Sequence, residues 1–150
     1  MRARRECSPS RRRRESGNTI MEFALASGVL FLLTFGVVDF GRMFYLADVA
    51  ASAAAAATQY GALSPAHYGD YDGMTAAAQA DAKNSNLTVN VTNFCACSIG
   101  GAKQTCPASC SGATETYIQA DVALPFSTMV NFPGLPPSTP ISATSIVRVK

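Results

Sequence analysis

The sequence predicts an α+β protein, in which a single N-terminal transmembrane helix extends into a small domain with about three antiparallel strands. An apolar run without proline covers residues 20–38, and Glu22 is its only ionisable residue. After Arg42 an alanine-rich stretch continues the helical pattern. Beyond Lys83 apolar and polar residues alternate, as is typical of half-buried strands.

The apolar run has the length of a membrane span. A helix over residues 20–38 is about 28 Å long, close to the ~30 Å hydrocarbon core of a bilayer. The run has no polar stripe, so it is not amphipathic. We therefore assign residues 18–42 to a transmembrane helix. Asp39 and Arg42, three residues apart, can pair at the membrane boundary, where aromatic side chains should form a belt: Phe40, Phe44 and Tyr45.

Residues 1–17 are expected to form a basic leader. The chain has 150 residues and a formal net charge of +2, but the arginines are concentrated before Gly17, at Arg2, Arg4, Arg5 and Arg11–Arg14. By the positive-inside rule this leader stays cytoplasmic, and residues 43–150 form a periplasmic α+β domain. The remainder of the chain is slightly acidic, which argues against nucleic acid as a partner.

Further elements follow from local signals. One helix should run over residues 19–60, with Ser16, Asn18 or Thr19 as its N-cap, and stop at Gly61 and Pro65. A second helix is predicted over residues 74–83, capped by Asp72 or Thr75. Strands are expected around residues 87–91, 116–124 and 141–150, with a proline-rich connection over residues 125–140. An antiparallel meander packed on the long helix is the simplest topology.

The second half of the chain contains four cysteines, at Cys95, Cys97, Cys106 and Cys110. In an oxidising periplasm an even set predicts two disulfides. Four cysteines allow three pairings; a C-x-C pair is too tight to bridge itself, which favours bonds from each of the first two cysteines to Cys106 or Cys110. The alternative is a zinc site, but structural zinc sites more often use C-x2-C, and no histidine is near. We expect no metal.

Motifs of catalysis and cofactor binding are not found. The chain has no G-x-S-x-G, no phosphate-binding glycine loop and no HExxH. His67 is the only histidine, and it has no partner at a catalytic spacing, so we expect it at the surface. The sequence therefore favours a protein that is not an enzyme and has neither a cofactor nor a small-molecule substrate.

The residues at the start of the apolar run form a specific pattern. G-N-T-I-M-E-F, from Gly17 to Phe23, is similar to a type IV prepilin-like signal, G-x-x-x-x-E-F. EFAL at residues 22–25 and FGVVDFGRMFY at residues 35–45 resemble the TadE-like pseudopilins of the Flp (tight adherence, type IVb) pilus system. A weaker resemblance covers residues 117–150. Gly28 replaces a proline that the family often has, and nearly pure alanine at residues 50–57 replaces its usual Arg and Glu.

The resemblance implies a minor pseudopilin with a pilin-like fold. A prepilin peptidase would cut after Gly17, making Asn18 the first residue, and Glu22 and Phe23 would serve assembly. Glu22 would neutralise the new α-amine of Asn18 in a neighbour or in the same chain. The implied partners are membrane lipid, the peptidase, other pilin-like subunits and the pilus secretion machinery. The implied location is the bacterial inner membrane, extending to the cell surface for an assembled fibre.

Small residues would let another helix approach the span closely. Ala24, Gly28 and Gly36 lie on one face, at spacings of four and eight residues. The alternative interpretation is ordinary tolerance of glycine in a membrane helix.

Two other functions are compatible with a basic segment followed by an apolar one. The first is a secreted protein with a cleavable signal, for which Ala51-Ser52-Ala53 is an A-x-A-like site. That site lies far downstream, and charged residues intervene. The second is a single-pass anchored periplasmic domain that is never processed.

Overall fold

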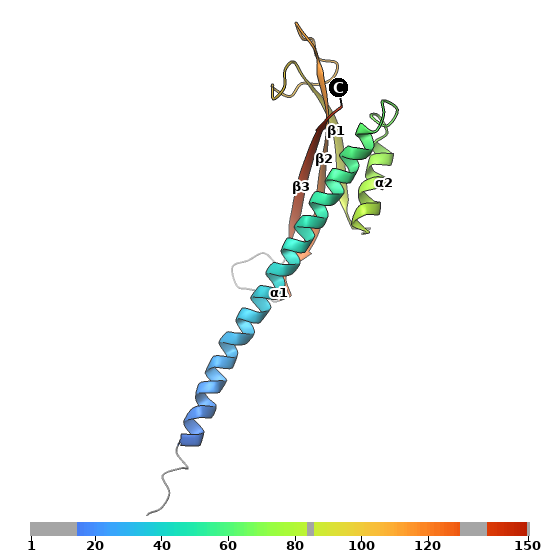
Figure 1. Ribbon diagram of the computed structural model, residues 1–150. Coiled ribbons are helices and arrows are strands. Elements are labelled where there is room, and N and C mark those ends of the chain that lie inside the picture. The colour runs from blue at the N-terminus through green and yellow to red at the C-terminus, as the bar shows by residue number, and fades with distance from the viewer. Residues whose placement is uncertain (1–14, 84–85, 130–137, 150) are drawn as a thin grey trace, which may run out of the picture. The chain divides into compact units, whose positions relative to one another are not determined.

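The computed structural model describes residues 15–83, 86–129 and 138–149 (Figure 1). Its elements are α1 (Glu15–Ala62), α2 (Tyr71–Ala82), β1 (Thr88–Ala96), β2 (Glu115–Ser127) and β3 (Ser138–Arg148). The predicted α+β class, with one long apolar helix and a three-stranded antiparallel sheet, is confirmed. The chain divides into two units, residues 1–38 and residues 39–150, and each is described by itself.

The helix α1 is longer than the sequence predicted. It has 48 residues and begins at Glu15, so Ser16, Asn18 and Thr19 are helical residues and the prediction that one of them is the N-cap is wrong. Nothing between Glu15 and Ala62 breaks a helix, because the glycines stand singly and no proline interrupts the run. The helix ends as predicted before Pro65, and Leu63 donates a backbone hydrogen bond to Tyr60.

The first unit is the apolar part of α1. Its large side chains are exposed around the helix: Phe23 is 72% exposed, Leu25 75% and Leu32 61%. Within the described residues, one helix is long and apolar enough to cross a membrane, and it is this one. An apolar surface of this kind on a helix of this length indicates a single-pass membrane anchor.

The second unit contains a sheet with the strand order β1-β2-β3, antiparallel throughout. Val89 stands opposite Val122, and Ile118 opposite Val147. The central strand β2 buries every second residue from Ile118 to Phe126. This period-two burial places one face of the sheet in the core.

The strands extend into the segment that the sequence assigned to a proline-rich connection. Pro125 lies in β2 and pairs with Pro140 in β3, so the prediction of a connection over residues 125–140 is wrong at both ends. The ladder between β1 and β2 stops at Ala123, and β3 is an edge strand. Both prolines therefore occupy places where a strand has a free edge and needs no donor.

The helix α2 begins earlier than predicted. Its N-cap is Asp70, whose Oδ1 accepts a 2.9 Å hydrogen bond from the Gly73 amide. The predicted caps Asp72 and Thr75 both lie inside the helix. Because Tyr71 and Asp72 are compatible with a first turn, the helix extends back to Asp70, whose side chain caps it. It ends at Lys83, which adopts the left-handed conformation with φ 49°.

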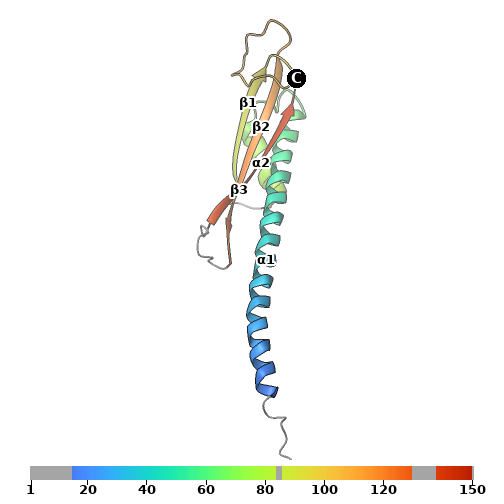
Figure 2. The same ribbon diagram turned by 90° about the vertical axis from the view of Figure 1, so that its left-hand side faces the viewer.

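Both helices of the second unit cover the same face of the sheet (Figures 1 and 2). Residues 39–62 of α1 contribute a completely buried stripe of alanines, which are Ala50, Ala53, Ala54 and Ala57. They pack in one core with Met74 of α2 and with Ile118, Val122 and Leu124 of β2. Small side chains let the helix backbone approach closely: a Cβ at Gly61 would lie 2.6 Å from Ile118 Cδ1. The alanine run thus forms the helix–sheet contact.

Two disulfides close the loop between β1 and β2. They join Cys95 to Cys106 and Cys97 to Cys110, with Cα–Cα distances of 5.2 and 5.3 Å. This is one of the two pairings that the sequence left open. Cys95 and Gln104 also exchange backbone hydrogen bonds of 2.9 and 2.8 Å, which fold the loop back onto the end of β1. The two bonds join a segment with few buried apolar residues to the sheet.

Candidate functional site

The predicted leader cleavage point lies in the first turn of α1. Gly17 and Asn18 are exposed, and a Cβ at Gly17 would meet no atom within 4 Å. The first four amides of a helix have no intrahelical acceptor. The arginines at positions 1–14 lie outside the described residues.

Glu22 and Phe23 follow on the same helix. Both are exposed, and Phe23 is 72% exposed. Asn18 and Glu22 are four residues apart, which places their Cβ atoms about 5–6 Å apart on one helix face. This spacing puts a carboxylate within reach of any positive charge at residue 18.

The small residues predicted to pack against another helix lie in the same exposed part of α1. Beyond Gly28 and beyond Gly36 a Cβ would enter open space, with no atom within 4 Å. Ala24 is exposed too. In the most apolar stretch of α1, only 6% of the stretch is buried within the protein. Among the described residues nothing covers these three positions, so a second helix or lipid has access to them.

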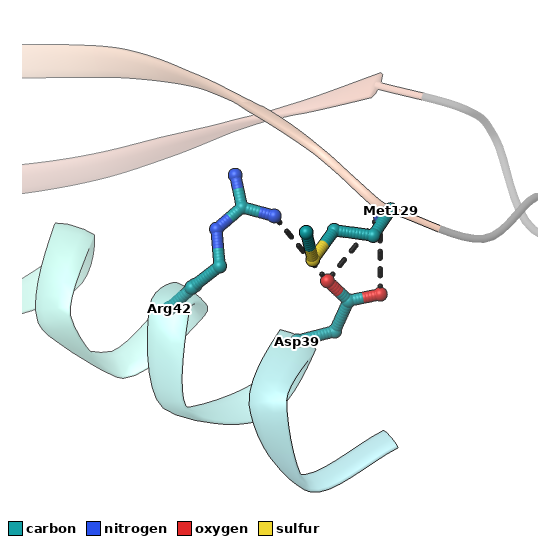
Figure 3. Close-up of polar contacts among 3 residues, drawn as sticks. All are labelled: Asp39, Arg42 and Met129. Atoms are coloured by element: carbon teal, nitrogen blue, oxygen red, sulfur yellow. Dashed lines mark hydrogen bonds and ion pairs between the residues drawn. The ribbon is translucent and has the colours of Figure 1, made fainter. Parts of the chain in front are cut away.

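Asp39 and Arg42 are brought together at the start of the second unit. Arg42 Nη1 lies 3.4 Å from Asp39 Oδ1, as the three-residue spacing predicts (Figure 3). Asp39 is 7% exposed, and both of its carboxylate oxygens accept from the backbone amide of Met129, at 3.3 and 3.2 Å. The carboxylate therefore ties α1 to the segment that follows β2 and shares its charge with a cation.

Sequence reasoning missed the partners of this pair on the sheet side. Met129 lies 90 positions from Asp39, and no local pattern connects the two. The Arg42 guanidinium carbon also lies 5.8 Å from the centre of the Phe126 ring, within cation–π range. The one sequence signal was the three-residue spacing of Asp39 and Arg42. It predicts that these two side chains pair, but it does not predict the contact with Met129.

A second polar cluster caps α2. The Tyr60 hydroxyl donates a 3.0 Å hydrogen bond to Asp70 Oδ2. The Gly73 amide, then the Tyr60 hydroxyl, lower the pKa of Asp70 below its usual value, because both stabilise the carboxylate. Conversely, the bond to Asp70 raises the pKa of Tyr60. His67 is half-buried, with its ring centre 4.5 Å from that of Tyr60, and its Nδ1 is hydrogen-bonded to Ser64, so it keeps only part of its surface exposed.

A cleft of about 290 Å³ opens beside the C-terminal end of α1. Among the described residues its lining consists of Gly61, Ala62, Leu63, Ser64, Pro65, Tyr68, Thr116 and Val149, and Tyr68 is the only titratable side chain of these. Ser64 in this lining is hydrogen-bonded to Nδ1 of His67, at 2.8 Å. Over the described ranges no group of three or more His, Cys, Asp or Glu side chains is placed to hold a metal ion.

One of the comparisons with known proteins finds a similarity, and it lies in the N-terminal helix. Residues 17–59 match the family described as TadE-like protein, a structural, pilus-related family, and this confirms the resemblance that the sequence predicted. The match begins at Gly17 and ends within α1, so it covers the exposed apolar part and most of the alanine stripe. It indicates involvement in a Tad/Flp pilus system. No curated protein and no solved structure matches the chain.

Proposed function

We propose that this chain, whose residues 17–59 match the TadE-like family, is a minor pseudopilin-type structural component for assembly of a Flp (tight adherence, type IVb) pilus. The observation that carries the proposal is the division of α1. Its first part exposes large apolar side chains and Glu22, while its second part is built into a folded, disulfide-bonded unit. A subunit that associates laterally within a membrane needs this arrangement.

The proposed topology places the leader in the cytoplasm and residues 43–150 in the periplasm, with the span in the bacterial inner membrane. The arginines before Gly17 support this orientation through the positive-inside rule. The two cysteine pairs at bonding distance support an oxidising compartment for the second unit.

Processing by a prepilin peptidase after Gly17 is the proposed first step. The glycine has no side chain to exclude, and the bond to Asn18 lies in an exposed part of α1. Cleavage would create an α-amine at Asn18, one turn before Glu22. Each charge alone would be costly near hydrocarbon, and the pair costs less because the two attract strongly in a low dielectric.

Lateral association through α1 is the proposed second step. Glu22 would neutralise the amine of its own chain before assembly or that of a neighbour within it. Phe23 would pack beside Glu22, and the face with Ala24, Gly28 and Gly36 would let a second helix approach closely.

The alternative of a secreted protein with an ordinary signal has a structural difficulty. Its A-x-A-like site ends at Ala53, which is completely buried in the core of the second unit. Cleavage there would remove Ala50 from the contact and leave Ala54 and Ala57 on a short helix remnant. The structure therefore favours retention of α1 in the mature protein.

The test is a set of Glu22 variants expressed in the native host. Glu22→Ala and Glu22→Gln should yield about tenfold fewer pili by electron microscopy, because each leaves the α-amine uncompensated. Both variants should still be found in the membrane fraction and should still begin at Asn18. Asp48→Ala, which removes an exposed carboxylate from the second part of α1, is the matched control and should form pili normally. Normal pili with Glu22→Ala would refute the proposed role.

A further inference from the structure

We propose that the segment following β2, at Met129, is a second contact of this protein with the surface of the lipid bilayer, and that Asp39 positions it there. The inference rests on the membrane span of the proposed function. It adds a contact site, formed by Met129 together with Phe40, Phe44 and Tyr45, and commits to lipid as the partner. These four residues are called the interfacial ring below.

The level of the ring along α1 follows from the length of the apolar run. Residues 20–38 span about 28 Å, so Asp39 stands at the edge of a hydrocarbon core of ~30 Å. Phe40, Phe44 and Tyr45 are 62%, 67% and 69% exposed, and they lie within about 9 Å of Asp39 along the helix axis. Aromatic side chains at this depth are typical of the membrane–water interface.

At this level of the helix, the side that carries Asp39 has no exposed aromatic side chain, and its apolar residues Met43 and Leu46 are half-buried. At about 100° per residue, Phe40 and Phe44 project about 100° and 140° from the direction of Asp39, and Tyr45 about 240°. The direction of Asp39 itself is occupied by Met129, whose amide the carboxylate binds (Figure 3). The Met129 side chain is 64% exposed. Met129 thus completes the ring on the side where α1 carries a charge.

The charges at this level are arranged for a region with little water. Asp39 is 7% exposed, and its oxygens are engaged by the Met129 amide and by Arg42, so the carboxylate does not need bulk water. The Arg42 side chain remains 44% exposed. It can extend toward lipid phosphates while its stem stays along apolar surface. A paired carboxylate, a partly exposed guanidinium and exposed apolar side chains suit contact with lipid headgroups better than contact with another protein.

The experiment places fluorescent probes on the full-length chain in lipid vesicles. A Cys7→Ser background removes the one cysteine outside the two disulfides. A single environment-sensitive fluorophore is attached, without reductant, to Met129→Cys, to Phe31→Cys in the span, or to Ile146→Cys on β3. Ile146 is 46% exposed and is the matched apolar control on the sheet. Vesicles of phosphatidylcholine and phosphatidylglycerol carry a nitroxide on the headgroup, high on the acyl chain, or deep on it.

The expected depths differ among the three sites. The probe at residue 129 should be quenched about twofold or more by headgroup and shallow nitroxides, and little by deep ones, as befits an interfacial side chain. The probe at residue 31 should respond to deep nitroxides, and the probe at residue 146 to none. Adding Asp39→Ala should reduce the quenching at residue 129 to the level at residue 146, without changing residue 31. Asp39→Asn, which keeps an acceptor for the amide, should retain part of it.

Two outcomes would overturn this inference and leave the proposed function standing. One is a probe at residue 129 that aqueous iodide quenches freely and lipid nitroxides do not, while residue 31 still responds to deep nitroxides. The other is protection from iodide that requires a co-reconstituted pilin-like subunit, which would assign the ring to a protein partner. A probe at residue 31 that no nitroxide quenches would overturn the membrane span itself, and with it both proposals.

Discussion

The two parts of α1 are one continuous helix with opposite surfaces. In residues 15–38, side chains as large as Phe31 and Leu32 are 63% and 61% exposed. In residues 39–62, the completely buried side chains are small, and Ala50, Ala53 and Ala54 are at 0% exposure. Large exposed apolar side chains need a partner outside the described chain, whereas the small buried ones already pack against other residues within it.

This difference shows that helical propensity and surface chemistry are independent. Alanine and leucine both favour a helix, so the backbone continues without a break across Val38. Side-chain size then decides what each part packs against: alanines bring a helix close to a sheet, and a full apolar surface matches hydrocarbon. Substitutions placed in each part should therefore have different effects.

The largest effect is expected from one substitution placed in each part. Leu32→Arg should oppose membrane insertion by about 3–4 kcal/mol, because a central arginine loses the transfer energy of leucine and adds the cost of a charge. Ala51→Arg, at an exposed position of the second part, should change insertion little. Carbonate extraction of membranes that express each full-length variant measures the inserted fraction. Equal extraction of both variants would remove the distinction between the two parts.

A smaller effect is expected from enlarging an alanine. Ala54→Leu should destabilise the second unit by about 1–3 kcal/mol, because a fully buried site against the sheet has no room for three more carbons. Ala26→Leu adds the same atoms to an exposed position in the first part and should leave stability unchanged. Thermal melting of the full chain in detergent, followed by circular dichroism, compares the two. A melting temperature for Ala54→Leu equal to that of the unmodified chain would mean that the alanine stripe is not closely packed.

The smallest effect on stability is expected from lowering the pH, and it should be limited to the second unit. The pKa of Asp70 is lowered from 3.8, so this carboxylate stabilises the folded state above about pH 3.8 and loses that contribution as the pH falls through its folded pKa. Asp70→Asn keeps an N-cap but has no charge to titrate. The two melting temperatures should therefore differ at pH 7 and converge below pH 3.8. A difference that stays constant over this range would show that Asp70 ionisation does not matter.

Much of the fold was predictable because its signals are local. The apolar run, the alanine stretch and the alternation in β1 each depend on neighbouring residues, and so does the pairing of Asp39 with Arg42. The N-cap of α2 was misplaced because Asp70 and Asp72 are both good caps, and the choice depends on a bond from the distant Tyr60. The strand positions of the two prolines could not be predicted either, since only the register shows where a strand has a free edge.

The residues of the candidate site also divide into those that the sequence identifies and those that it does not. Gly17, Glu22 and the small residues after them are close in sequence and could be named from it. The contact between Asp39 and Met129 joins positions far apart in the chain and depends on the length of β2, which sequence patterns place only approximately.

We propose that this protein is a pseudopilin that is processed after Gly17 and remains in the membrane. The most direct measurement is the intact mass, with N-terminal sequencing, of the protein recovered from membranes of its native host. We expect a chain that begins at Asn18, retains Glu22 and contains two disulfides. A soluble chain that begins near Ala54, or a membrane-bound chain that still carries residues 1–17, would contradict it.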